Sequence, residues 1–175
     1  MSDVVRFPEA GVPLAAARMA IDAVRGKSFV NRATGISAHL SSSAKGKLVS
    51  NKATGKSKAN GFTREQHNAM AARVGELFEI ARLIESRPDR NGDANILSIK
   101  RFAVHVVFGE KNAIAWITVK ESKQHGHHIY SVEAIKLETL DRIVEVVSGN
   151  TPHASSVPLA KMLANAVKTV KGAAS

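Results

Sequence analysis

The segment from residue 96 to residue 137 constrains the fold most strongly, because it holds three consecutive runs rich in Val, Ile and aromatic residues. The runs cover residues 96–108, 113–121 and 128–137, and a polar stretch containing a glycine separates each from the next. Such runs are typical of β-strands joined by tight connections. The sequence therefore predicts three antiparallel strands, with residues 109–112 as a four-residue hairpin loop.

A long amphipathic helix is predicted in front of these strands. Thr63 and Gln66 fit a capping box, and apolar residues then recur at helical spacing. The helix should end near Arg87, because the ring of Pro88 disfavours helical backbone at the residue before it.

Shorter elements flank this central part. Residues 12–25 predict a helix between Pro13 and Gly26. Residues 29–40 predict a β-hairpin, and residues 140–147 and 157–171 predict two C-terminal helices. We therefore expect an α+β fold, with a long helix packed on an antiparallel β-sheet and flanking N- and C-terminal helices. The expected division is a helical extension over 1–28, an α+β nuclease-like domain over 29–137, and C-terminal helices over 138–175 packed on it.

Residues 41–60 differ from the rest of the chain, because they carry five lysines and no acidic residue. Ser, Gly and Asn fill most of the remaining positions, which predicts a flexible basic loop. The whole chain has a formal net charge of +10. Such an excess indicates a polyanionic partner, either nucleic acid or an anionic membrane surface.

Other features narrow the class of protein. The chain has no cysteine, which excludes disulfides, thiolate metal sites and a cysteine nucleophile. No apolar run approaches the length of a membrane span, and the N-terminus lacks the pattern of a signal peptide. We expect a location in the cytoplasm, or delivery into a target cell.

Two motifs resemble ligand sites but are incomplete. Gly55, Lys56 and Ser57 match the end of a phosphate-binding loop, yet the glycine that should come five residues earlier is Ser50. The histidines of residues 125–128 lack nearby carboxylates to complete a metal site. Acidic residues are few, which disfavours a hydrolase that depends on Mg²⁺. We expect neither a metal nor a cofactor.

The predicted hairpin separates its residues onto two faces. With a four-residue loop, one face is uniformly apolar and should pack on the long helix. The other face pairs His105 with Trp116 and Arg101 with Lys120, and two opposed cations favour a bound anion between them. Sheets that bind RNA combine cations with aromatic side chains in this way. The alternative is that Trp116 packs under another helix, with the two cations on a solvated rim.

The face that the third strand presents stays open at this stage. Either His128, Tyr130 and Val132 share the face of His105, or Ile129, Ser131 and Glu133 do.

Residues 118–121 (TVKE) and 126–131 (GHHIYS), after the lysine-rich segment and the long helix, carry a family resemblance. From about residue 31 to 137 the chain resembles large polyvalent protein-associated and phage head-morphogenesis C-terminal domains. Those domains are assigned to the nuclease superfamily of barnase, EndoU, colicin-type tRNA nucleases and RelE. The resemblance implies one or more helices followed by a four-stranded antiparallel sheet, with RNA on the open face of the sheet.

These observations predict a metal-independent endoribonuclease or a nuclease-like toxin domain, because the RNA 2′-hydroxyl is an internal nucleophile that needs only an acid, a base and a cation. We expect His105 and His67 as acid and base, and Lys120 and Arg101 as cations that stabilise the phosphate. The expected substrate-binding residues are Trp116, Thr118, Tyr130, Ser131, Lys52, Lys56 and Lys58.

The expected partners are RNA and an immunity or antitoxin protein. Two alternatives are a non-catalytic nucleic-acid-binding module and a protein-interaction module of phage or effector origin.

Overall fold

One curled, mixed β-sheet forms the main body of the fold. The computed structural model describes residues 4–140, and strands account for 41% of them against 31% for helices. The sheet runs in the order β1-β5-β6-β7-β3-β2, and β4 pairs with β5 beside β1. The strands are β1 (Val4–Phe7), β2 (Ser28–Val30), β3 (Ser37–His39), β4 (Arg82–Arg87), β5 (Ile96–Phe108), β6 (Lys111–Gln124) and β7 (His127–Thr139).

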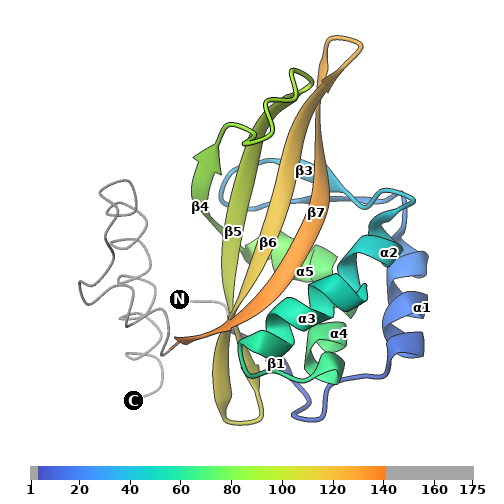
Figure 1. Ribbon diagram of the computed structural model, residues 1–175, viewed down its shortest axis with the longest axis vertical. Coiled ribbons are helices and arrows are strands. Elements are labelled where there is room, and N and C mark those ends of the chain that lie inside the picture. Colours follow the sequence, from blue (N-terminus) through green and yellow to red (C-terminus); the bar gives the residue numbers. More distant parts are fainter. Residues whose placement is uncertain (1–3, 141–175) are drawn as a thin grey trace.

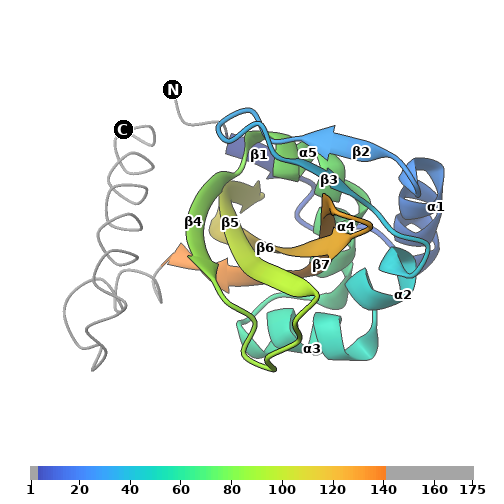
Figure 2. The ribbon, with the colours of Figure 1, turned by 90° about the horizontal axis from the view of Figure 1, so that it is seen from above.

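Short helices pack on one side of this sheet (Figure 1). They are α1 (Leu14–Val24), α2 (Ala44–Leu48), α3 (Asn51–Ala59), α4 (Arg64–Ala72) and α5 (Val74–Ile80). Seen from above, β4 to β7 follow a curve like half of a barrel (Figure 2). The expected architecture, a long helix packed on an antiparallel sheet, is therefore wrong. The helices are short, and the sheet is mixed because β1 is parallel to β5 and β3 is parallel to β7.

The helix predicted from Thr63 to Arg87 is instead two short helices, α4 and α5, divided at Arg73. The second ends at Ile80, where a distant side chain satisfies its last carbonyls. Asn31 donates from Nδ2 to the carbonyl oxygens of Phe78 and Ala81, both at 2.7 Å. Helix termini need such partners, and this one comes from the turn between β2 and β3. The chain then leaves the helix and residues 82–87 form β4, which pairs antiparallel with β5.

The basic segment is helical, so the expectation of a flexible loop over residues 41–60 is wrong. Ser50 begins α3 as its N-cap, and its side chain accepts a hydrogen bond from the backbone of Ala53. Ala53, Thr54 and Ser57 are buried. These small residues let α3 lie close to β7, where its side chains bond the backbone of Leu137.

Several local predictions are confirmed. The helix over residues 12–25 is α1, and residues 29–40 contain the antiparallel pair β2–β3. Thr63 and Gln66 make both hydrogen bonds of the capping box at the start of α4. Residues 1–28, expected as a helical extension, also hold the strand β1, which pairs with β5, while α1 packs on α4. The predicted C-terminal helices over 140–147 and 157–171 lie, but for Leu140, outside the described residues.

The β5–β6 hairpin turns over two residues, Gly109 and Glu110, because Phe108 pairs with Lys111. Gly109 adopts a positive φ of 62°, as a two-residue hairpin turn requires. The loop is two residues shorter than predicted, so each cross-strand pair shifts by two positions. A shift by an even number keeps every side chain on its predicted face.

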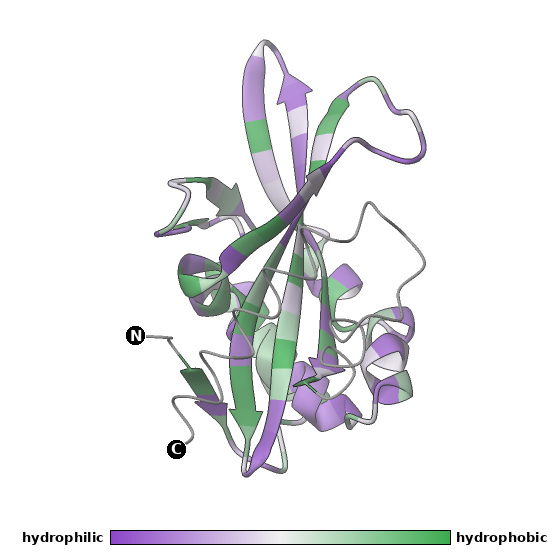
Figure 3. Ribbon diagram, turned by 90° about the vertical axis from the view of Figure 1, so that its left-hand side faces the viewer, coloured by the Kyte–Doolittle hydropathy of each residue, from purple (hydrophilic) through white to green (hydrophobic). Residues whose placement is uncertain are grey.

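The predicted apolar face is therefore confirmed, and it forms the core with the helices. Its residues are at most 5% exposed: Phe102, Val104, Val106 and Phe108 on β5, and Ala113, Ala115, Ile117 and Val119 on β6. Phe78 of α5 meets Phe102 edge-on at 5.0 Å between ring centroids. Hydrophobic and hydrophilic residues alternate along the strands (Figure 3). Within residues 4–140, none of the helices combines the length and apolarity that a membrane span needs.

Candidate functional site

Trp116 lies at the centre of the sheet face that the sequence predicted as the site. The guanidinium of Arg101 covers its ring at 4.3 Å from the centroid, and Trp116 donates from Nε1 to Glu138 at 2.9 Å. The residue is 4% exposed. Arg101 also lies 3.7 Å from Glu85. A base could stack on Trp116 only after Arg101 moved away.

The pairs predicted across this face differ in the structure. Arg101 lies opposite Thr118, and His105 lies opposite Ile114. Lys120 lies opposite Ile99, six residues before His105, which corresponds to about 20 Å at roughly 3.3 Å per residue. His105 and Lys120 therefore cannot contact the same phosphate in this structure.

His105 is held by Asn112. Its Nε2 lies 2.8 Å from Oδ1 of Asn112, an atom that only accepts, so Nε2 carries the proton. Nδ1 is then unprotonated in the neutral ring, and it is buried without a partner among the described residues. Burial lowers the pKa of His105, and the hydrogen bond to Asn112 opposes part of this effect.

His67 is fully buried in the core, and not on an exposed helix face as the sequence suggested. Its Nε2 donates to the carbonyl oxygen of Leu48 at 2.8 Å. Its Nδ1 therefore accepts from the hydroxyl of Ser57 at 2.7 Å. Burial lowers the pKa of His67, although the bond to Leu48 opposes the shift. With both nitrogens bonded and no exposed surface, His67 is in the position of a structural residue.

The phase of the third strand follows from its pairing with β6. Ser131 lies opposite Lys120, and Tyr130 lies opposite Glu121. Ile129 and Ser131 therefore share the face of His105, whereas His128 and Tyr130 point to the opposite face with Glu121. The structure thus separates two predicted neighbours, Tyr130 and Ser131.

Glu121 is the centre of a polar cluster on that opposite face. Its Oε2 accepts from Nδ1 of His128 at 2.8 Å and from the hydroxyl of Tyr130 at 2.9 Å. Its Oε1 accepts from the hydroxyl of Ser98 at 2.7 Å, and the ammonium of Lys100 lies 3.8 Å away. We call these five residues the Glu121 cluster. The cluster places an imidazole, a phenol, a hydroxyl and an ammonium within 3.8 Å of one carboxylate.

The exposure of the cluster is uneven. The side chain of Glu121 is only 12% exposed, whereas that of His128 is 56% exposed. Because the carboxylate fixes the proton on Nδ1, the Nε2 lone pair of neutral His128 is available to a molecule outside. The arrangement can therefore orient an imidazole as a base.

The sequence analysis missed Glu121, His128, Ser98 and Lys100 as site residues. One signal was present in the sequence: the pair His125–Gly126 between two runs of strand-forming residues, which suits a two-residue hairpin turn. His125 and Gly126 both adopt positive φ, 50° and 82°, as in a type I′ hairpin turn. A two-residue turn at this point sets Gln124 opposite His127 and therefore Glu121 opposite Tyr130.

Through Glu121, the free energy of unfolding is expected to depend on pH in the acidic range. Burial alone would raise its pKa, but the hydrogen bonds from Ser98, His128 and Tyr130 and the charge of Lys100 lower it from 4.5 to about 2. The ionised form therefore stabilises the folded state above pH 4.5, and this contribution is lost as the pH falls towards 2.

We expect Glu121→Gln to lower the free energy of unfolding by about 2 kcal/mol at neutral pH, as for other hydrogen bonds to a charged group. Urea denaturation at pH 7 and pH 3 checks this, because the difference between the two proteins should shrink at the lower pH. A difference that is the same at both values would contradict this role of the carboxylate.

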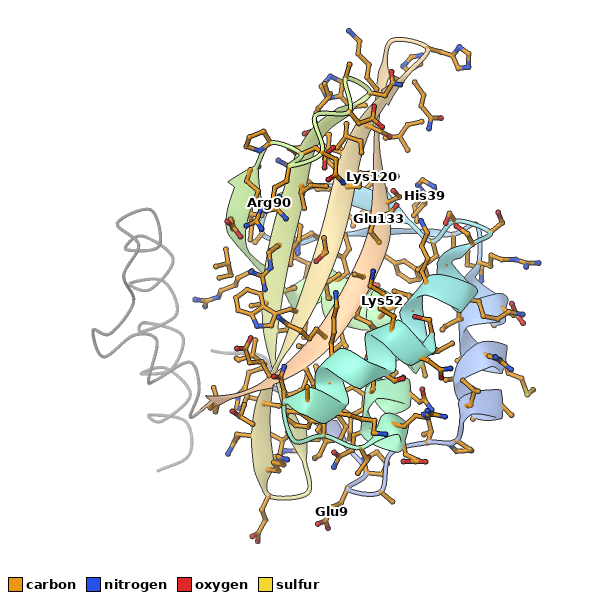
Figure 4. The ribbon with its side chains drawn as sticks, in the orientation of Figure 1. Glu9, His39, Lys52, Arg90, Lys120 and Glu133 are labelled. Atoms are coloured by element: carbon orange, nitrogen blue, oxygen red, sulfur yellow. The ribbon has the colours of Figure 1, made fainter. Side chains whose placement is uncertain are left out.

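Exposed lysines lie on the helical side of the sheet. Lys52, Lys56 and Lys58 are exposed on α3, and Figure 4 shows Lys52 on this helix below the upper half of β6 and β7. Lys47 of α2 is paired with Glu133. Within residues 4–140, no group of three or more His, Asp or Glu side chains converges as a metal site would require.

The protein is a small domain in which short helices pack on a curled, mixed β-sheet, and the sheet carries the polar Glu121 cluster. Residues 14–130 match the model of one protein family, described as large polyvalent protein-associated domain 3, and the chain belongs to this family. The expected resemblance to polyvalent protein-associated domains is thereby confirmed. No curated protein and no solved structure matches the chain. The matched segment runs from α1 to Tyr130 and includes every residue of the Glu121 cluster.

Proposed function

We propose that this domain binds RNA and cleaves it without a metal ion, at the Glu121 cluster. The observation that carries the proposal is the pair of hydrogen bonds on one carboxylate oxygen, which Glu121 accepts from His128 and Tyr130. A buried carboxylate that orients an exposed imidazole is a recurrent arrangement for general-base chemistry.

The chemistry needs only the protein, the RNA and a water molecule. Nε2 of His128 takes the proton of a ribose 2′-hydroxyl, and the 2′-oxygen then forms a bond to the adjacent phosphorus. The bond from phosphorus to the 5′-oxygen breaks, which leaves a 2′,3′-cyclic phosphate. The leaving 5′-oxygen takes a proton from a water molecule, the hydrogen bond from Tyr130 holds Glu121 in place, and Lys100 stabilises the charge that develops on the phosphate.

The order of elements supports this proposal. The helices α4 and α5 precede β4, β5, β6 and β7, and each of these strands is antiparallel to the next. Within the larger mixed sheet, this part alone has the layout that the resemblance to the barnase, EndoU, colicin and RelE superfamily implies, with helices followed by four antiparallel strands. The Glu121 cluster lies on the three longest strands of this unit.

The proposed reacting groups lie on the opposite face of the sheet from Trp116, where the sequence predicted the site. His105 is bonded to Asn112 and Arg101 covers Trp116, whereas His128 has an exposed ring beside a carboxylate. Tyr130 stays in the proposed site, while Thr118 and Ser131 lie on the face of Trp116.

The exposed lysines of α3 are proposed to attract the RNA backbone. Replacing Lys52, Lys56 and Lys58 together by glutamine should weaken RNA binding and reduce the slope of log K against log salt by about 2, since a single strand contributes roughly 0.7 per neutralised phosphate. Fluorescence anisotropy with a labelled single-stranded RNA at several salt concentrations measures this slope. An unchanged slope would mean that RNA does not contact α3.

Incubation of the full chain with labelled single-stranded RNA in EDTA tests the proposed activity. The expected products end in a 2′,3′-cyclic phosphate, and Glu121→Gln should reduce their rate of formation. His127→Gln is the matched control, because His127 is an exposed neighbour of His128 outside the cluster. Binding that falls with salt, without any cleavage, would overturn the catalytic proposal in favour of a non-catalytic RNA-binding module.

A further inference from the structure

A polar cleft of about 580 Å³ lies on the face of β6 and β7 opposite the Glu121 cluster. Its walls come from three parts of the chain: the end of β3 with α2, the connection between β4 and β5, and the end of β6 with the first half of β7. Lys120, Glu133 and His39 lie close together at this cleft (Figure 4). The cleft has the size of a small-molecule site.

Two lysines from different elements meet at one carboxylate in the cleft. Nζ of Lys47, on α2, lies 2.7 Å from Oε2 of Glu133, and Nζ of Lys120, on β6, lies 3.2 Å from Oε1. The hydroxyl of Ser131 donates to the same Oε1 at 3.2 Å. Glu133 thus accepts three hydrogen bonds from groups that would equally serve a phosphate.

A β-bulge aims Glu133 into this position. Thr118 pairs with Ala134 and Val119 pairs with Val132, so Glu133 is the extra residue of β7. Bulges re-aim a side chain and are over-represented next to functional sites. The side chain of Glu133 is 22% exposed, so the carboxylate can be replaced by a ligand from the solvent.

The remaining lining also suits an oxyanion. Lys123 adds a third cation, whereas Asp93 is the other acidic residue of the cleft. His39 is fixed in this lining, because its Nδ1 donates to the carbonyl oxygen of Tyr130 at 2.9 Å. Hydroxyl groups that can donate to phosphate oxygens come from Ser41, Ser43, Ser122 and Ser131.

We propose that this cleft binds the phosphate group of a nucleotide or of an RNA end, and that the Glu133 carboxylate occupies the phosphate position between Lys47 and Lys120 when the ligand is absent. The ligand displaces Glu133 from the two ammonium groups, and no bond is made or broken. The site is separate from the Glu121 cluster, because Lys120 and Glu121 point to opposite faces of β6. The inference therefore does not depend on RNA cleavage.

Isothermal titration calorimetry of the full chain with inorganic phosphate tests the proposal. Glu133→Gln should raise the affinity for phosphate at least about tenfold over the parent protein, because the competing charge is removed while the side chain keeps its size. Lys47→Gln and Lys120→Gln should each lower it by about tenfold in the Glu133→Gln background.

Two controls separate a specific site from a change in net charge. Asp93→Asn removes a carboxylate of the same cleft that contacts neither lysine, and should raise the affinity by less than about threefold. Lys27→Gln removes an exposed cation outside the cleft and should change nothing. Equal affinities of the parent protein and Glu133→Gln, or no loss in the lysine variants, would overturn the proposal.

The two sources of phosphate are distinguished with adenosine 5′-monophosphate and a short RNA with and without a 5′-phosphate. Tighter binding of the phosphorylated RNA than of its unphosphorylated form identifies an RNA end as the ligand. Equal binding of the two RNAs, with strong binding of adenosine 5′-monophosphate, identifies a free nucleotide. Lys47 is exposed on α2, so Lys47→Gln in the parent protein, which should also lower the affinity for phosphate, keeps the test valid if Glu133→Gln does not fold.

Discussion

Replacing His128 by alanine is expected to lower the rate of RNA cleavage by about 10²–10⁴-fold, the range that a general base contributes. The imidazole is the exposed member of the Glu121 cluster, and Glu121 orients it through Nδ1 at 2.8 Å. RNA affinity should stay within a few-fold, because the attraction to RNA arises mainly from the lysines. Single-turnover cleavage in EDTA and anisotropy on the same RNA separate the two effects.

Three further variants test whether the loss of cleavage is specific to His128. His127→Ala removes the neighbouring exposed imidazole and should cleave like the parent protein. Tyr130→Phe keeps the ring but removes the hydrogen bond that holds Glu121, so it should also slow cleavage. His105→Ala tests the face first expected from the sequence. Loss of cleavage in His105→Ala, with full activity in His128→Ala, would move the active site to the Trp116 face.

Sequence patterns predicted the parts of the fold that depend on neighbouring residues. The capping box at Thr63, the helix α1 and the apolar face of the β5–β6 hairpin are all confirmed. The hairpin loop was predicted two residues too long, but each side chain still lies on its predicted face, because strand side chains alternate with a period of two. Only the partners across the strands changed, and this moved His105 away from Trp116.

The features that sequence reasoning missed depend on contacts between distant residues. The end of α5 is fixed by Asn31, which lies 47 and 50 residues before the two carbonyls that it binds. The helix α3 is lysine-rich and has little apolar surface, but its buried Ser57 accepts a hydrogen bond from the backbone of Leu137. Neither contact leaves a local pattern, so both regions were assigned from composition and periodicity alone.

The candidate site was predictable only in part. Lys120 on β6 and Tyr130 on β7 were selected from the sequence, but Glu121, which follows Lys120, was missed because its partner depends on the register of β6 and β7. The turn at His125 and Gly126 determines that register. The position of Glu133 depends on a bulge, which the alternation of residues in β7 does not show.

His67 is expected to be essential for stability and not for chemistry. It connects α4 to α2 through the carbonyl of Leu48 and to α3 through Ser57, whose oxygen in turn accepts from the backbone of Leu137. His67→Ala leaves buried polar groups without partners and creates a cavity, so it should lower the free energy of unfolding by about 4 kcal/mol. Urea denaturation at pH 8 measures the loss.

The pH dependence of stability distinguishes this structural role from a catalytic one. Burial lowers the pKa of His67 in the folded state, so the unfolded chain binds the proton more readily as the pH falls below the ordinary value of 6.5. Stability is therefore complete above this pH and is lost below it, by up to about 1.4 kcal/mol per pH unit for one group. His105 adds an effect of the same sign, because burial also lowers its pKa.

The stability of His67→Ala should therefore fall less between pH 8 and pH 5.5 than that of the parent protein. The stability of His125→Asn, in the exposed turn, should fall as much as that of the parent protein. The cleavage rate per folded molecule should stay close to that of the parent protein, because the side chain has no exposed surface from which to reach RNA. A His67→Ala protein of normal stability that no longer cleaves RNA would assign the chemistry to His67. The buried chain of hydrogen bonds from Leu48 to Leu137 would then have to open for each turnover.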